Sequence, residues 1–169
     1  MAIFSANLEN LRQLYVDQLQ HLYSVETQLT EALPKMADAA TDTQLKQAFT
    51  NHLQETRQHV SRLKQILGNT QQSVDAKKSK AMATLITEGE DMIKDAKDNS
   101  VRDAGLILAA QRVEHYEIAS YGALRHFAQV LGEDQAAQIL DETLKEEDHA
   151  DHLLTEISKS ANPRANKAA

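Results

Sequence analysis

Two glutamates in one helical segment are the first residues of this sequence that could do chemistry. The segment "AQRVEHYEIASYGAL" spans Ala110–Leu124, and helical residues advance by about 100° each. By that count Glu114 and Glu117 lie near the centre of the apolar face, whereas Arg112 and His115 lie opposite. Burying an ionised carboxylate costs several kcal/mol, so two inward glutamates indicate a compensating partner.

The segment Glu142–Leu154, "ETLKEEDHADHLL", repeats this pattern. Glu147 and Asp151 lie on its apolar stripe, four residues and therefore about one helical turn apart. Glu146 and His149 have the Glu-x-x-His spacing of di-metal carboxylate bundles, but His149 points away from the stripe. The ligands expected from this segment are therefore Glu147 and Asp151.

Two histidines and two further glutamates complete the candidate set. In the segment "HLQETRQHVSRL", His52 and His59 lie on the apolar face, and Glu55 lies at its flank. A lone histidine on an apolar face is usually a hydrogen-bonded core residue. Two of them that bracket a glutamate indicate at least one ligand, and which one stays open. Glu26 lies at the edge of the apolar face of an earlier segment, "LYSVETQL".

These inward carboxylates need neutralising charge, and no Lys or Arg lies near the centre of any of the four stripes. Shared protons and hydrogen bonds are one remedy, and bound metal is the other. Carboxylate and imidazole ligands suit iron, manganese or zinc. Two divalent ions about 3.5–4 Å apart would supply four positive charges. We therefore expect a dinuclear site, with iron or manganese preferred and zinc as the alternative, whose ligands come from Glu26, His52, Glu55, His59, Glu114, Glu117, Glu147 and Asp151.

Tyr121 lies one turn beyond Glu117 on the same face and is the candidate catalytic residue. Its hydroxyl would hydrogen-bond a bridging oxygen or donate an electron, and simple core packing is the alternative. A site of this kind would make the protein an oxidoreductase that acts on peroxide or oxygen. Iron sequestration without turnover and a non-catalytic interaction protein are the two other interpretations.

Composition restricts the class of protein further. The chain has 169 residues, a net charge of −7 and no cysteine, which excludes disulfides, thiolate metal sites and cysteine nucleophiles. Its acidic balance argues against binding to nucleic acid. No apolar run is long enough to span a membrane, and the opening "MAIFSANLEN" has no signal-peptide pattern, so a cytoplasmic location is expected.

Low glycine and proline content with abundant Ala, Leu, Gln, Glu and Lys predicts an all-α protein. The third expected helix has few apolar residues, which is typical of a crossover on the surface of a bundle. The pattern predicts one ferritin-like domain over residues 1–160, an antiparallel four-helix bundle with an additional crossover helix between the second and third bundle helices. Residues 161–169 are expected to be a disordered tail. The expected helices are Asn7–Ala40, with Asn7 as N-cap and a kink at Pro34, then Thr43–Leu67, Val74–Lys97, Ser100–Leu131 and Glu133–Ser160.

The sequence also resembles the bacterial YciE/YciF stress-protein family, a group of unknown function in the ferritin-like superfamily. The resemblance covers nearly the whole chain, and "VRDAGLILAAQRVEHYEIASYGAL" (Val101–Leu124) is its most specific part; the three segments quoted earlier also match. It implies a rubrerythrin-like bundle that is dimeric, cytoplasmic, linked to stress and similar to di-iron or di-manganese proteins at its centre.

The predicted ligands match the family pattern, except that His59 stands where family members carry glutamine. The second helix also lacks the Glu-x-x-His pair of di-iron bundles, because Glu55 is followed by Gln58. A homodimer is expected, and the outward face of the fourth helix carries small residues that permit close helix approach, namely Ala119, Gly122 and Ala123 beside His115.

Overall fold

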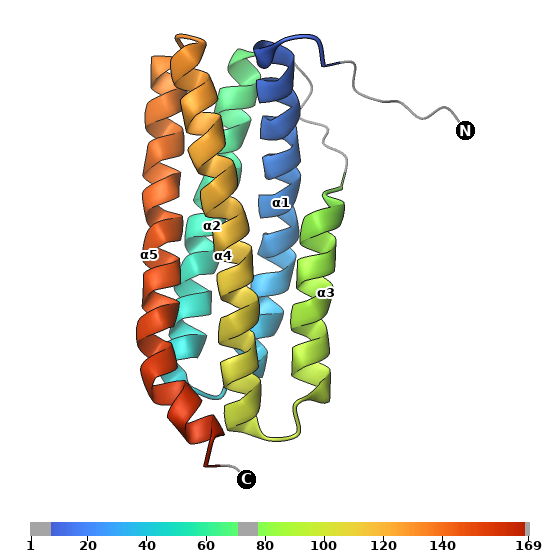
Figure 1. Cartoon of the computed structure of the whole chain (residues 1–169), viewed down its shortest axis with the longest axis vertical. Helices are drawn as coiled ribbons and strands as arrows, with labels where there is room; N and C mark the ends of the chain where they lie inside the picture. The colour runs from blue at the N-terminus through green and yellow to red at the C-terminus, as the bar shows by residue number, and fades with distance from the viewer. Residues whose placement is uncertain (1–7, 71–77, 168–169) are drawn as a thin grey trace, which may run out of the picture.

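A computed structural model describes residues 8–70 and 78–167 of the chain. This part of the chain consists of helices and their connections, with no strand. The helices are α1 (Leu11–Ala39), α2 (Thr43–Asn69), α3 (Lys80–Asp95), α4 (Asn99–Val130) and α5 (Asp134–Ala165). Figure 1 shows α1, α2, α4 and α5 as a bundle, with the shorter α3 beside α1 and α4. The predicted all-α bundle with a crossover helix is therefore confirmed.

Each of the first four helices begins at a polar side chain that accepts a hydrogen bond from a backbone N–H of the first turn. These N-caps are Asn10, Asp42, Ser79 and Asp98. The cap of α1 is Asn10, whereas the predicted cap, Asn7, lies outside the described residues. None of the described helices is long and apolar enough to cross a membrane.

The C-terminal ends of α1 to α4 lie within two residues of the predicted ends, whereas that of α5 does not. Helix α1 continues through Pro34 to residue 39, as predicted to within one residue. The predicted start of α3 at Val74 lies outside the described residues. Helix α5 continues to residue 165, so residues 161–165 are helical where a disordered tail was predicted. The side chain of Ala161 is only 1% exposed, and Arg164 forms an ion pair with Asp42. Core contact and this pair together fix the last turn.

A buried carboxylate holds the connection between α1 and α2 against α4. Asp103 is 3% exposed and accepts hydrogen bonds from the backbone N–H groups of Thr41 and Asp42, both at 2.9 Å, and from the Thr41 hydroxyl at 2.6 Å. All of its acceptor oxygens have donors, so this buried charge needs no other partner. It shows how the fold satisfies a structural carboxylate.

Candidate metal centre

Four carboxylates and two imidazoles occupy the middle of the bundle, where a core of leucine, alanine and aromatic side chains surrounds them. All four long helices contribute, because each has a polar residue on the face that packs inward. The most exposed member retains only 6% of its accessible surface. The six residues are Glu26 on α1, His52 and His59 on α2, Glu114 and Glu117 on α4, and Glu147 on α5.

The first of two ligand groups joins α2, α4 and α5. His52, Glu114, Glu117 and Glu147 each offer one ligand atom, and these atoms lie within 4.8 Å of one another. The Nε2 atom of His52 lies 3.4 Å from Glu114 Oε1 and 3.6 Å from Glu147 Oε2. Three carboxylates and one imidazole converge here, which is a ligand set for a divalent transition metal.

The second group joins α1, α2 and α5. Glu26, His59 and Glu147 again offer atoms within 4.8 Å of one another. His59 Nδ1 lies 3.1 Å from Glu147 Oε1 and 3.4 Å from Glu26 Oε1, and the Tyr121 hydroxyl donates a hydrogen bond to Glu26. Glu147 belongs to both groups, so its carboxylate lies between the other members of the two groups.

The carboxylates of this cluster are not satisfied by the protein as Asp103 is. Both oxygens of Glu117 and of Glu147 are buried without a hydrogen-bond partner, as is one oxygen each of Glu26 and Glu114. The close approach of His59 Nδ1 to Glu147 lacks hydrogen-bond geometry. Native proteins rarely leave buried acceptors unpaired. Four carboxylates would balance two divalent cations, so these residues fit a dinuclear metal site.

Burial and mutual repulsion favour the protonated form of the carboxyl groups in the metal-free protein. Burial raises the pKa of Glu117 well above its usual range, and the nearby Glu26 and Glu147 raise it further. Burial likewise raises the pKa of Glu26, against the lowering effect of His59. For Glu114, burial outweighs the charge of His52 and raises the pKa to about 8. Some of these carboxyl groups therefore hold protons at neutral pH.

The two histidines are shifted toward their charged form. Burial alone would lower the pKa of His52, but Glu114, the contact with Glu55 and Glu147 raise it to about 10. Burial also opposes protonation of His59, and Glu147 and Glu26 raise its pKa to about 11. A metal ion binds the neutral imidazole, so metal binding at these residues must displace protons.

Each imidazole has an outer carboxylate that orients it. His52 Nδ1 lies 3.3 Å from Glu55 Oε2, and His59 Nε2 lies 2.8 Å from Glu146 Oε2. Arg62 donates hydrogen bonds to both oxygens of Glu146. Carboxylates in this position fix the ring and strengthen it as a ligand of metals. Both histidines thus present one nitrogen to the cluster and the other to a carboxylate nearer the surface.

Six of the eight sequence-predicted ligands come together, and two do not. Glu55 lies outside both groups with 36% of its side chain exposed, and it contacts the outer nitrogen of His52. Asp151 also lies outside them, where it accepts a hydrogen bond of 3.1 Å from Gln111. Both were placed on or near an apolar stripe by angle alone. How deeply a side chain is buried in the bundle depends also on how closely the neighbouring helices pack against it.

Sequence reasoning missed Glu146 and Arg62 as parts of this site. The sequence analysis considered Glu146 only as the partner of His149 in a Glu-x-x-His pair. The side chain of His149 is exposed, as the helical count predicts. Arg62 lies three residues after His59, and side chains at that spacing share a face, so this spacing was the available signal. Recognising the contact required knowing that α2 packs against α5 at this height.

Comparisons with known proteins give consistent matches over nearly the full chain. The family described as "Domain of unknown function (DUF892)" matches residues 10–167. Protein YciF of Escherichia coli (strain K12) is 43% identical over 166 residues, which cover 96% of this chain and 99% of that protein.

Two solved structures support the same relationship. The crystal structure of the E. coli stress protein YciF is similar with a TM-score of 0.88 at 41% identity, and the match covers 92% of this chain and 98% of that one. YcfI from Rhodopseudomonas palustris is similar with a TM-score of 0.86 at 37% identity, covering 90% and 98%. These matches agree with the resemblance seen in the sequence.

Proposed function

The chain belongs to the DUF892 family of YciF-like proteins, and we propose that it is a stress-response protein with a dinuclear iron or manganese centre that acts on peroxide or oxygen. The observation that carries this proposal is the buried cluster of four glutamates and two histidines, whose carboxylate oxygens are largely unpaired. Ferritin-like di-metal bundles use the same number of glutamates and histidines. Here both histidines come from α2 and two of the glutamates from α4.

The proposal gives each residue of the cluster a role that its position supports. Glu147 would bridge the ions, with His52, Glu114 and Glu117 completing one position and Glu26 and His59 the other. When bound, the metal pair would supply Lewis acidity and redox capacity.

The tyrosine beside this site serves as a hydrogen-bond donor. Tyr121 is 1% exposed and donates to Glu26. Burial, reinforced by the charge of Glu26, raises the pKa of Tyr121 well above its usual range. Its hydroxyl therefore keeps its proton and fixes the orientation of Glu26.

The alternative is a non-catalytic protein that holds iron without turnover or only has a structural role. The raised pKa values favour it, because protons on Glu114 and Glu117 lower the cost of burying these groups without metal. It predicts a melting temperature that chelators leave unchanged.

Metal content per chain tests the proposal directly. Protein purified without a histidine tag and reloaded with Fe²⁺ or Mn²⁺ is expected to retain two ions per chain by mass spectrometry. Glu114→Ala removes a proposed ligand that is only 2% exposed, and we expect the variant to lose stoichiometric metal. His152→Ala, which changes an exposed side chain on α5, is the control and should retain both ions. A Glu114→Ala protein with two bound ions would contradict the ligand assignment.

We also propose that the protein works as a cytoplasmic homodimer that pairs through the outer face of α4. This face combines the small exposed residues Ala119 and Ala123 with apolar side chains that remain exposed, Leu108 at 49% and Val130 at 61%. Sedimentation velocity is expected to show a dimer at micromolar concentration, and Ala119→Arg should convert it to a monomer. A monomeric unmodified protein would rule this surface out as an interface.

A further inference from the structure

A narrow pocket between α2 and α5 reaches the metal cluster from the surface. It has a volume of about 70 Å³, and its lining includes His52 and Glu114 of the cluster together with Glu55, His149 and Ala150. A wider surface hollow of about 520 Å³ between the same helices shares three lining residues with it, Ala48, Asn51 and Leu153. The two spaces adjoin at these residues, and we call them together the α2–α5 passage.

The polar groups along this passage are suited to a cation. Glu55 lies at its side with 36% of its side chain exposed. Deeper in, Glu114 is 2% exposed and has one buried oxygen without a partner. An ion that leaves the hollow therefore meets a carboxylate near the surface and then, in the cluster, a carboxylate with one free oxygen. Ala48 and Ala150 line the passage with short side chains, which leave room in it. Leu153, which is 37% exposed, lines both spaces.

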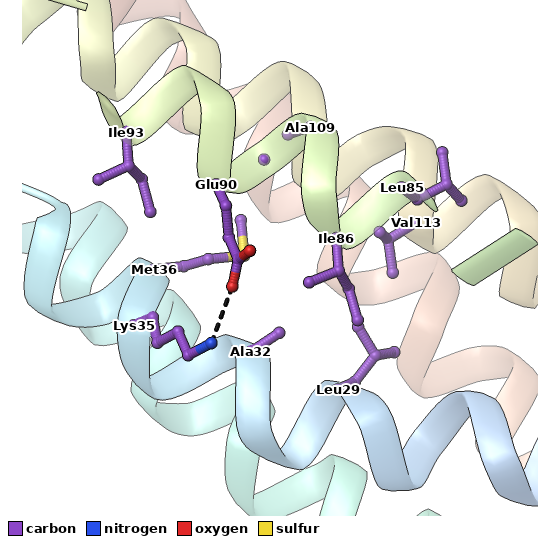
Figure 2. A pocket seen from close by; sticks show the side chains of 11 residues that line it. Leu29, Ala32, Lys35, Met36, Leu85, Ile86, Glu90, Ile93, Ala109 and Val113 are labelled. Carbon is purple, nitrogen blue, oxygen red and sulfur yellow. Dashed lines mark hydrogen bonds and ion pairs between the residues drawn. The ribbon is translucent and has the colours of Figure 1, made fainter. Parts of the chain in front are cut away.

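A second pocket, between α1, α3 and α4, has no such series of ligands. Figure 2 shows it between α1, α3 and α4, with apolar side chains such as Leu29, Ile86 and Val113 around it. Lys35 and Glu90 form an ion pair of 2.8 Å across it. None of its lining residues belongs to the two ligand groups found in the described part of the chain. A cation there would find one carboxylate that is already paired with a lysine.

We infer that the α2–α5 passage is the route by which divalent cations enter and leave the metal centre, with Glu55 as the first carboxylate they bind. This inference rests on the proposed function, because it requires a metal centre at the inner end. It gives Glu55 a purpose that fits its position outside both ligand groups. It also makes Leu153 the side chain that limits the width of the passage.

Uptake kinetics of Co²⁺, followed by stopped-flow absorbance on the full chain, test the route. Leu153→Ala widens the passage and should raise the association and dissociation rate constants by the same factor, because a route acts equally in both directions. Ala150→Val narrows it and should lower both. The number of Co²⁺ ions bound at equilibrium should stay the same in both variants. Removing the charge with Glu55→Gln should slow association about 10-fold, within the range of electrostatic steering.

Glu90→Gln is the matched control, because it removes a carboxylate beside the other pocket and should leave Co²⁺ uptake unchanged. Unchanged rates in both Leu153→Ala and Ala150→Val, with two ions bound, would overturn the route while leaving the metal centre intact. A change in dissociation alone with Glu55→Gln would also overturn it, since that result assigns Glu55 only to the positioning of His52. No Co²⁺ binding by the unmodified protein would instead defeat the proposed function itself.

Discussion

Glu147→Gln is expected to abolish binding of the metal pair while the metal-free protein keeps its fold. Glu147 is the only residue shared by the two ligand groups, so its loss affects both metal positions. Even changes to outer partners of metal ligands weaken metal binding by about 10–100-fold, and a bridging ligand should exceed that range. Glutamine keeps the size of the side chain, so the packing of the core is retained, but it replaces the carboxylate shared by both ligand groups with a neutral amide.

Loss of metal binding with the fold retained separates a metal ligand from a structural residue. Isothermal titration with Mn²⁺ measures metal binding, and the melting temperature in chelator measures whether the fold is retained. Asp151→Asn is the matched control, because it removes one carboxylate charge one turn further along α5, outside the cluster. It should retain two ions. Loss of stability without loss of metal in Glu147→Gln would show that Glu147 serves packing and not metal binding.

The metal-free protein is expected to lose stability as pH rises from about 5 to 9. The folded-state pKa of Glu114 is about 8, against 4.5 in an unfolded chain. Between these two pH values the unfolded state ionises this group more readily than the folded state, so the free energy of unfolding falls as pH rises. The folded-state pKa values of His52 and His59 are about 10 and 11, above 6.5, so the stability that they contribute is fully present below pH 6.5. It is lost as pH rises toward those folded-state values. All three groups act in the same direction.

Metal should reverse this trend. Binding displaces at least the protons of the two imidazoles, so affinity for metal increases with pH. At free metal about 1,000 times the dissociation constant, each site adds roughly 4 kcal/mol, and each kcal/mol raises the melting temperature of a chain of this size by about 2–4 °C. Two sites therefore predict a difference of roughly 15–30 °C between metal-loaded and chelator-treated protein, largest at the alkaline end.

Scanning calorimetry at several pH values, with Mn²⁺ and with chelator, measures both trends. A titration in two buffers of different ionisation enthalpy counts the protons released. Equal melting temperatures with and without metal across this range would favour the structural alternative. In that case protons and hydrogen bonds alone satisfy the inward glutamates.

The local pattern of the sequence was enough to place the helices and to identify four of the acidic residues that face inward, although it also included Glu55 and Asp151, which lie outside the cluster. Helical periodicity repeats within a few residues, so the burial of Glu114, Glu117 and Glu147 follows from counting along single helices. The sparse apolar face of α3 likewise predicted a helix outside the bundle. The same pattern did not predict that α5 continues to residue 165, because Ala161 is held by contacts with other helices of the core, which a local pattern does not contain.

Only the tertiary structure decided how these inward groups combine. Which nitrogen of His52 and of His59 faces the cluster depends on the rotation and relative height of α2, α4 and α5, and packing between distant segments sets these. The same packing makes Glu147 the shared carboxylate, leaves Glu55 at the side of the α2–α5 passage and brings Glu146 to His59. A one-dimensional pattern gives the direction of each side chain around its own helix. Contacts between ligands also need the distances between helices, which the pattern does not contain.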